Sequence, residues 1–350
     1  MSILFTIVSI GFVVFIHELG HLIAAKRAKV GVTEFAVGMG PKIWSFNYQD
    51  TMYSLRLLPV GGFIKAKGLD DLEDCPIEQD YREKSILARA SIIVVGSLMN
   101  LILGCVIFCV FGAMIGEPSV HNEIEQVMDN YPAAINGLQP GDKIVKVNNY
   151  PIQNITTDFI NVVKASKGES ISIVYQRNNE MNTIDLSAIP SESNQYVIGV
   201  SFKVINIPLS FLDALQYGVK QTVFTIHQSM VGLKLLISGQ ASINDLAGPV
   251  GIIQFASSQF SSGIYSFFSF MAFISISLGV INLFPIPVLD GGHLLFLLIE
   301  AIRRKPLNKK IELALHNTAA VLLITLMCFT VFNDVTKWNE RVDIIKELNK

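Results

Sequence analysis

Charged residues are scarce in this sequence, at 16% of its 350 positions, whereas hydrophobic residues make up 51%. Soluble globular domains carry about 25% charged residues. The composition therefore excludes an ordinary soluble protein and favours a polytopic membrane protein with room for one soluble domain. A surplus of either sign of charge is also absent, because the net charge is only −2. This balance argues against nucleic acid as a partner.

Cysteine is rare as well, and the four cysteines lie in stretches of different character. Cys105 and Cys109 share one apolar run, Cys328 lies in another, and Cys75 sits in a polar stretch. This distribution excludes a disulfide framework and favours free thiols.

Basic residues are missing ahead of the first apolar run. Residues 3–25 contain no charge except Glu18 and are long enough to cross the ~30 Å hydrocarbon core of a bilayer. Lys26, Arg27 and Lys29 follow at once, which is the reverse of a cleavable signal peptide with a basic start. The positive-inside rule therefore predicts an external amino terminus and places the second half of this span toward the cytoplasm.

Three ionisable side chains in that span form the pattern H-E-x-x-H. His17 and His21 are four residues apart, so on a helix they share one face within reach of a single ion. In sites of this kind two imidazoles and a third protein ligand hold Zn²⁺, the fourth position is open to water, and Glu18 would act as the general base. A pair of packed core histidines is the plain alternative. Because ionisable groups cost about 2.5–3.5 kcal/mol each inside a bilayer, we favour a zinc site.

The rest of the site is expected in the last long apolar run. Residues 264–299 are interrupted only by Asp290 and His293, yet a straight helix of that length would be ~54 Å long, more than a bilayer requires. The helix must therefore break, and Pro285 and Pro287 supply the place. Asp290 would be costly if unpaired in the membrane and is the predicted third zinc ligand. His293 remains open between a ligand and a packing residue.

The soluble character of residues 117–204 sets them apart from the apolar runs. Residues 133–149, with the sequence A-A-I-N-G-L-Q-P-G-D-K-I-V-K-V-N-N, resemble the signature of PDZ domains, which bind extended peptides by strand addition. Asn149 stands where such domains usually carry glycine, but asparagine tolerates a left-handed backbone. The resemblance implies a single PDZ-like domain that contacts a peptide or a substrate ectodomain.

These patterns predict the fold class: a polytopic α-helical membrane protein with four transmembrane helices, a membrane-associated β-hairpin sheet and an inserted PDZ-like α+β domain. The expected domains are a first membrane half at 1–116, the PDZ-like domain at 117–204, interfacial amphipathic helices with a connection at 205–263, and a second membrane half at 264–350. The expected parts of the two membrane halves are spans at about 3–25 and 91–116, a cytoplasmic-side β region at 32–68, a broken span at about 264–300, a span at about 313–332 and an external tail.

Two regions leave alternatives open. Residues 32–68 alternate apolar and polar residues between glycines, which predicts hairpins. They form either a surface hairpin or a small sheet beside the active site, whose free edge pairs with an unwound substrate strand. Asn100 in the second span is either a structural amide between helices or a residue that supports the site.

Together these motifs resemble the site-2 protease family of intramembrane zinc metalloproteases, and most of all its bacterial RseP type, the regulator of sigma-E protease. Many members of that type have tandem PDZ domains where this chain shows one, and Ser97 stands where members often have proline. Besides the PDZ-like insert, the resemblance rests on H-E-L-G-H at 17–21, F-A-V-G-M-G-P at 35–41, L-P-V-G-G-F at 58–63, G-P-V-G-I at 248–252 and the segment 282–292.

The resemblance implies a function and a location. It implies regulated intramembrane proteolysis, in which the enzyme cleaves the transmembrane segment of a trimmed single-span substrate such as an anti-sigma factor, or a remnant signal peptide. It places the chain in the bacterial inner membrane, with both termini and the PDZ-like domain in the periplasm and the active site toward the cytoplasm. The residues that it implicates are His17, His21 and Asp290 as zinc ligands, Glu18 as the catalytic residue, and Gly61, Gly62, Asn282, Pro285 and Pro287 in substrate positioning.

Two rival functions remain at this stage. A non-enzymatic membrane scaffold with a peptide-binding PDZ domain and a structural metal site would need a fourth protein ligand, for which His293 is the only nearby candidate. An ion transporter that used Glu18 and Asp290 would explain neither the histidine spacing nor the peptide-binding insert. The sequence therefore favours a zinc-dependent intramembrane endopeptidase.

Overall fold

The computed structural model describes residues 2–68, 77–148, 150–152, 155–191, 195–240, 242 and 246–338. Cys75 and Asn149, which the sequence analysis singled out, lie outside these ranges. The chain forms two compact units. We call Gly112–Phe211 the inserted unit, and we call Met1–Phe111 together with Leu212–Lys350 the membrane unit.

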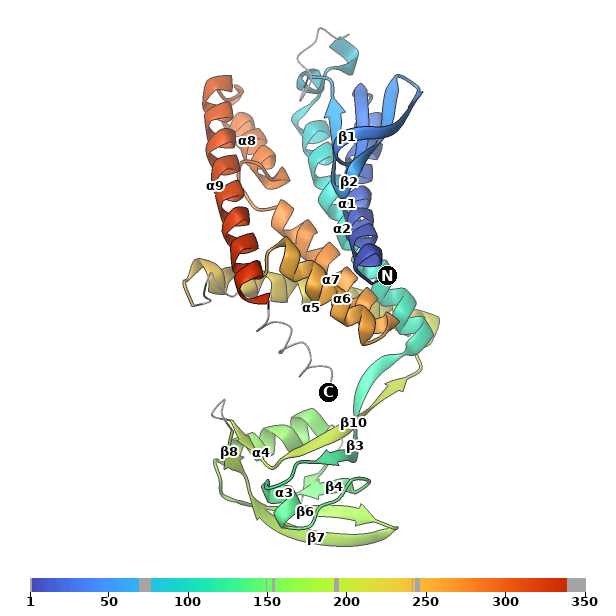
Figure 1. The fold of residues 1–350 in the computed structure, drawn as a ribbon, viewed down its shortest axis with the longest axis vertical. Helices are drawn as coiled ribbons and strands as arrows, with labels where there is room; N and C mark the ends of the chain where they lie inside the picture. Colours follow the sequence, from blue (N-terminus) through green and yellow to red (C-terminus); the bar gives the residue numbers. More distant parts are fainter. Residues whose placement is uncertain are drawn as a thin grey trace. The chain divides into compact units, whose positions relative to one another are not determined.

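Within the described residues, four helices are long and apolar enough to cross a bilayer. Their outward faces keep large hydrophobic side chains exposed, Phe12, Val106 and Leu322 among them, as expected of surfaces that meet lipid rather than water. These four apolar helices, which are labelled in Figure 1, are α1 (Ser2–Arg27), α2 (Ile86–Ile115), α7 (Ile264–Asn282) and α9 (Lys309–Thr336).

Glycines allow α1 and α7 to approach α2 closely. A Cβ atom on Gly20 of α1 would lie 2.7 Å from the carbonyl oxygen of Val95, and one on Gly279 of α7 would lie 2.8 Å from the carbonyl oxygen of Ser97. Both carbonyls belong to α2, so this helix packs against both neighbours through contacts that only small residues permit. The helix runs unbroken through Ser97.

A break separates α7 from α8 (Asp290–Arg303). Helix α7 ends at Asn282, and the connecting loop contains Pro285 and Pro287, which lack the backbone donors that a continuing helix needs. The loop folds against the start of α8, where a Cβ atom on Gly292 would lie 2.7 Å from the Cα atom of Pro287. As a result Asp290 is the first residue of a new helix.

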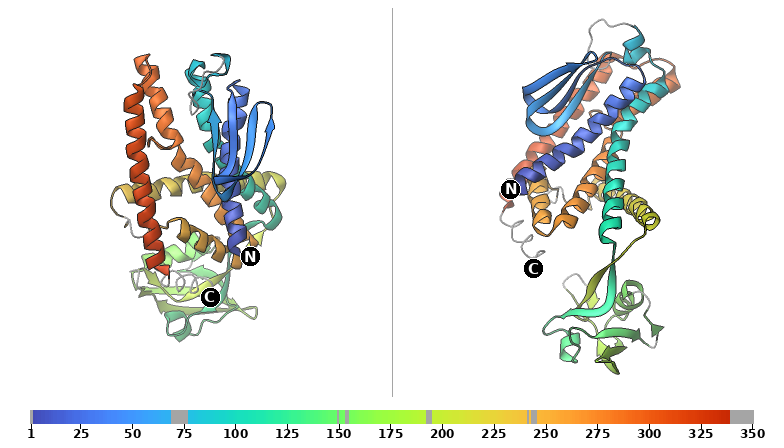
Figure 2. Two further views of the ribbon diagram at one scale, coloured as in Figure 1. Left: turned by 45° about the horizontal axis from the view of Figure 1, so that its top comes forward. Right: turned by 90° about the vertical axis from the view of Figure 1, so that its right-hand side faces the viewer.

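Strands β1 (Val32–Tyr48) and β2 (Thr51–Ala66) form an antiparallel hairpin with several register shifts. The hairpin runs alongside α1 (Figure 2). Its closed end, by Tyr48, is exposed, whereas Phe35 and Ala66 at the open end are buried in a core shared with α1 and α2. Two short 3-10 turns, η1 (Ile77–Gln79) and η2 (Tyr81–Glu83), precede α2.

Glu34 is a buried carboxylate within this hairpin. It accepts hydrogen bonds from Ser54 Oγ at 2.8 Å and from Arg56 at 2.7 Å. Burial by itself would raise the pKa of Glu34, but these hydrogen bonds and the charge of Arg56 lower it below its usual value. The charged carboxylate therefore links the two strands across the hairpin.

Two further helices complete the described membrane unit. Helix α5 (Phe211–Ile237) lies across the direction of the long helices in Figure 1, and α6 (Pro249–Ser261) packs against α1, α7 and α9. Asp334 near the end of α9 accepts hydrogen bonds from the backbone N–H groups of Gly248 and Gly251, at 3.0 and 2.8 Å. This buried carboxylate satisfies free donors at the start of α6 and ties α9 to it.

The inserted unit is an α+β domain built on an antiparallel sheet with strand order β10-β3-β4-β6-β7. Its core contains Ile144, Phe159 and Ile173. The buried carboxylate of Asp142 pairs at 2.7 Å with the partly exposed Arg177, which raises the pKa of Arg177. The elements are β3 (Glu117–Val127), α3 (Pro132–Ile135), β4 (Lys143–Val147), β5 (Tyr150–Pro151), the π-helical turn η3 (Ile155–Ile160), α4 (Asn161–Ala165), β6 (Ser170–Arg177), β7 (Glu180–Ser187), β8 (Ile189–Pro190), β9 (Tyr196–Val197) and β10 (Val200–Ile207).

The predicted fold class is confirmed in its architecture: the chain is a polytopic helical membrane protein with a hairpin sheet and an inserted α+β domain.

Candidate metal centre

Three predicted ligands meet in the membrane unit. His17 and His21 lie one turn apart on α1, both buried, with their Nε2 atoms 3.1 Å apart. The Oδ2 atom of Asp290 lies 3.3 Å from the first Nε2 atom and 3.5 Å from the second. The first residue of α8 therefore faces the second half of α1, although a helical break and most of the chain separate them in sequence.

The three donor atoms have the spacing that a tetrahedral zinc site requires. Zinc binds imidazole nitrogen and carboxylate oxygen at about 2.0–2.2 Å, so two ligands of a tetrahedron lie roughly 3.3–3.6 Å apart. Two of the observed separations, 3.3 and 3.5 Å, lie in this range and the third, 3.1 Å, is slightly shorter, so the three atoms approximate one face of such a tetrahedron. Among the described residues, this is the one group of three histidine, cysteine or acidic side chains whose ligand atoms lie close enough to share an ion.

Helix α2 orients His21. The Nδ1 atom of His21 lies 2.8 Å from the carbonyl oxygen of Ile92, a contact that requires a proton on Nδ1 and leaves Nε2 free to bind a metal. Gly96, one turn further along α2, makes room for the imidazole, because a Cβ atom there would overlap the ring of His21. This arrangement fixes both the tautomer and the position of the ring.

Two neutral polar side chains approach the ligands. Ser97 of α2 donates a hydrogen bond to Asp290 Oδ2 at 3.3 Å, and the amide nitrogen of Asn282 lies 3.3 Å from His17 Nε2. Asn282 was predicted from its motif, whereas Ser97 was noted only as a departure from the family pattern. No spacing rule in the sequence connects Ser97 to the site, because its hydrogen bond reaches Asp290 on a different helix.

Glu18 is half-buried and faces the hairpin. A Cβ atom on Gly62 of β2 would lie 3.0 Å from Glu18 Cγ, so the glycine brings the strand close to the acidic side chain. Gly61 has a φ of +83° and packs against Met39 instead. Of the two predicted glycines, Gly62 is the one that borders the site.

Asn100 lies on α2, one turn beyond Gly96. Its side chain is fully buried, and neither its amide nitrogen nor its amide oxygen has a hydrogen-bond partner among the described residues. Its backbone carbonyl accepts a hydrogen bond from Ser275 of α7. The structure thus places Asn100 in the contact between α2 and α7, and its role at the site stays a prediction.

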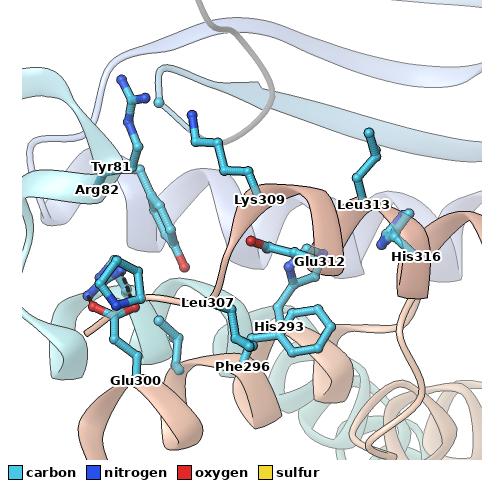
Figure 3. A pocket seen from close by; sticks show the side chains of 14 residues that line it. Tyr81, Arg82, His293, Phe296, Glu300, Leu307, Lys309, Glu312, Leu313 and His316 are labelled. Carbon is cyan, nitrogen blue, oxygen red and sulfur yellow. Dashed lines mark hydrogen bonds and ion pairs between the residues drawn. The ribbon is translucent and has the colours of Figure 1, made fainter. Parts of the chain in front are cut away.

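His293 lies outside the cluster of metal-ligand candidates. It lines a cavity of about 510 Å³ formed by α8, α9 and the residues around Tyr81 (Figure 3). Its ring centroid is 5.7 Å from that of His316 of α9, and the ion pair of Arg89 with Glu300 forms another wall of the cavity. A fourth protein ligand from His293, which the scaffold hypothesis requires, is not part of this geometry.

Comparisons with known proteins find similar chains in other bacteria. A relative from Clostridium acetobutylicum is 36% identical over 337 residues, which cover 95% of this chain and 97% of that one. The regulator of sigma-W protease RasP of Bacillus subtilis is 31% identical over 413 aligned positions, with 95% of this chain and 97% of that protein covered. The zinc metalloprotease RasP of Bacillus licheniformis is 32% identical, with 93% and 97% covered.

Among solved structures, the PDZ domain of an SdrC-like protein from Listeria monocytogenes matches 24% of this chain and 86% of its own length, at 21% identity and a TM-score of 0.22. The pattern of peptidase family M50 matches residues 5–326, which is most of the chain. The paired histidines and the carboxylate that meets them therefore belong to a zinc metalloprotease, and the chain is a member of peptidase family M50.

Proposed function

We propose that this membrane metalloprotease hydrolyses peptide bonds within the transmembrane segments of single-span proteins, either anti-sigma-factor-like substrates or remnant signal peptides. The observation that carries the proposal is the triangle of His17, His21 and Asp290, in which both histidines lie on α1, a helix long and apolar enough to cross a bilayer. A metal site at that depth serves substrates that are themselves in the membrane.

The residues around the triangle have distinct tasks in the proposed reaction. When bound, zinc supplies a Lewis acid that polarises a carbonyl and lowers the pKa of water. Glu18 takes the proton from the attacking water and returns it to the amide nitrogen that leaves. The amide of Asn282, 3.3 Å from His17 Nε2, donates a hydrogen bond to the developing oxyanion or to the substrate backbone.

The hairpin and the broken helix hold the substrate in the proposed complex. A helical substrate shields its carbonyls in its own hydrogen bonds, so it must unwind before hydrolysis. An unwound segment can pair with the edge of the β1–β2 hairpin by strand addition, and Gly62 would bring it beside Glu18. The loop with Pro285 and Pro287 supports the same segment, because its backbone is already non-helical.

The proposed location is the bacterial plasma membrane. Lys26 and Arg27 at the end of α1, and the basic residues between α8 and α9, support a cytoplasmic position for these ends. Both termini and the PDZ-like inserted unit then lie on the periplasmic side, where that unit contacts the ectodomain or a peptide of the substrate. The active site lies toward the cytoplasm.

Glu18→Gln tests the proposal directly. The variant should bind zinc as the wild type does but cleave a single-span test substrate about 10²–10⁴-fold more slowly, because a general base contributes that much. Cleavage by the purified full-length protein is measured from the mobility of the substrate and its product on a denaturing gel. Metal content is measured by elemental analysis. A chelator should abolish wild-type cleavage and added zinc should restore it. Normal turnover by Glu18→Gln would refute the assigned role.

A further inference from the structure

We propose that Ser97 is a positioning residue that holds Asp290 in the orientation required for metal binding. This inference rests on the proposed role of His17, His21 and Asp290 as the zinc site. It assigns a specific task to a hydroxyl group of α2 at the position where the resembling family often has proline.

The geometry of the hydroxyl group carries the inference. Ser97 is fully buried, and its Oγ atom donates a hydrogen bond to Oδ2 of Asp290 at 3.3 Å. This is the same carboxylate oxygen that faces the Nε2 atoms of His17 and His21. The hydroxyl group therefore selects which oxygen of Asp290 points at the histidines.

Several other hydroxyl groups in the helices bond within their own helix, whereas Ser275 reaches across to the backbone carbonyl of Asn100. Thr222, Thr318 and Thr325 each bond back to a carbonyl four residues earlier in their own helix, at 2.8 Å, which is the usual local partner for such a side chain. Ser97 instead reaches across to a residue of α8. A contact that forgoes the local partner in favour of a metal-ligand candidate points to a role in the site.

Asp290 needs such a partner because of its place in the chain. It is the first residue of α8 and directly follows the loop that contains Pro285 and Pro287, so the preceding turn of helix that would pack against its side chain is missing. His21, by contrast, is held within a continuous helix and by the carbonyl of Ile92. Helix α2 thus orients two of the three ligands, one through Ile92 and the other through Ser97.

A purely structural role for Ser97 makes a different prediction. The backbone of Ser97 lies in the close contact between α2 and Gly279 of α7, where any small residue would fit equally well. Alanine preserves that packing and removes only the hydroxyl group. Ser97→Ala therefore separates the two roles, and Ser97→Thr restores a hydroxyl group at the same position.

The test measures zinc affinity of the purified full-length protein by competition with a chromophoric chelator. Ser97→Ala should bind zinc about tenfold more weakly, since outer partners of metal ligands typically contribute 10–100-fold to affinity. Ser97→Thr should recover most of the loss. Ser275→Ala is the matched control, because Ser275 is equally buried and donates its hydrogen bond to the backbone of Asn100 instead.

The outcomes separate this inference from the proposed function. Wild-type affinity in Ser97→Ala, or an equal loss in Ser275→Ala, would overturn the role of Ser97 and leave the zinc site intact. Failure of the wild type to bind zinc, or undiminished zinc in His17→Ala, would instead overturn the site on which the inference rests. Melting temperatures of the zinc-free variants, which should match within the series, show whether a loss of affinity comes from misfolding.

Discussion

The two halves of the metal centre are built in opposite ways. Helix α1 presents His17 and His21 from one unbroken stretch, so their shared face follows from a spacing of four residues. Asp290 comes from a helix that has been interrupted and restarted, so its position depends on the loop before it and on contacts with α2. The first half is therefore rigid by local geometry, and the second half is rigid only if its surroundings hold it.

The largest effect is expected from removing the ligand that the broken half supplies. Asp290→Ala should lower zinc affinity by more than about 100-fold, because a direct ligand contributes more than an outer partner does, and proteolysis should be lost with the metal. Elemental analysis and chelator competition measure the change, with His21→Ala as the comparison from the unbroken half. Undiminished zinc stoichiometry in Asp290→Ala would point to another third ligand.

A smaller effect is expected from repairing the break. In the double variant Pro285→Ala with Pro287→Ala, the loop regains two backbone donors and can continue as helix, which shifts Asp290 relative to the histidines. A displacement of about 1 Å costs on the order of 10²-fold in rate. The rate at which the double variant cleaves the test substrate measures this loss. Pro249→Ala is the control, because that proline stands at the start of α6, where the missing donor has no helical partner. Equal losses in both would argue against a special role for the break.

The unbroken half is sensitive to crowding from α2. Gly96→Ala places a methyl group on the ring of His21, and overpacking of this kind typically destabilises by about 1–3 kcal/mol, so both the melting temperature and zinc affinity should fall. Gly232→Ala in α5 is the matched control, since a Cβ atom there meets nothing within 4 Å. That change should stabilise by about 0.5–1 kcal/mol. If Gly96→Ala changed neither the melting temperature nor the zinc affinity, the ring of His21 would have room to move.

The smallest effect is expected at His293, which shares α8 with Asp290 but faces the cavity shared with His316. His293→Ala should leave zinc content unchanged, because the ring lies outside the ligand cluster. Elemental analysis of His293→Ala and Asp290→Ala side by side compares the zinc content after changes to two residues of the same helix. A loss of zinc in His293→Ala would revive the scaffold with a closed, four-ligand site.

Much of the architecture follows from local patterns. Apolar length predicted the four long helices, and the proline pair indicated a break before Asp290, which the structure places between Asn282 and Asp290. Periodicity could not reveal that Glu18 would lie beside Gly62, or that Asn282 would approach His17. Those contacts join segments far apart in sequence, and no spacing rule connects them.

The sequence by itself determined the pairing of His17 and His21, because residues four apart on a helix must share a face whatever surrounds them. Only the tertiary structure decided that Ser97 and Ile92 would orient the ligands and that His293 would turn away from them. These outcomes depend on how α2, α7 and α8 pack together. Packing is a cooperative property of side chains from distant segments, so it cannot be inferred from the local structural preference of any one segment.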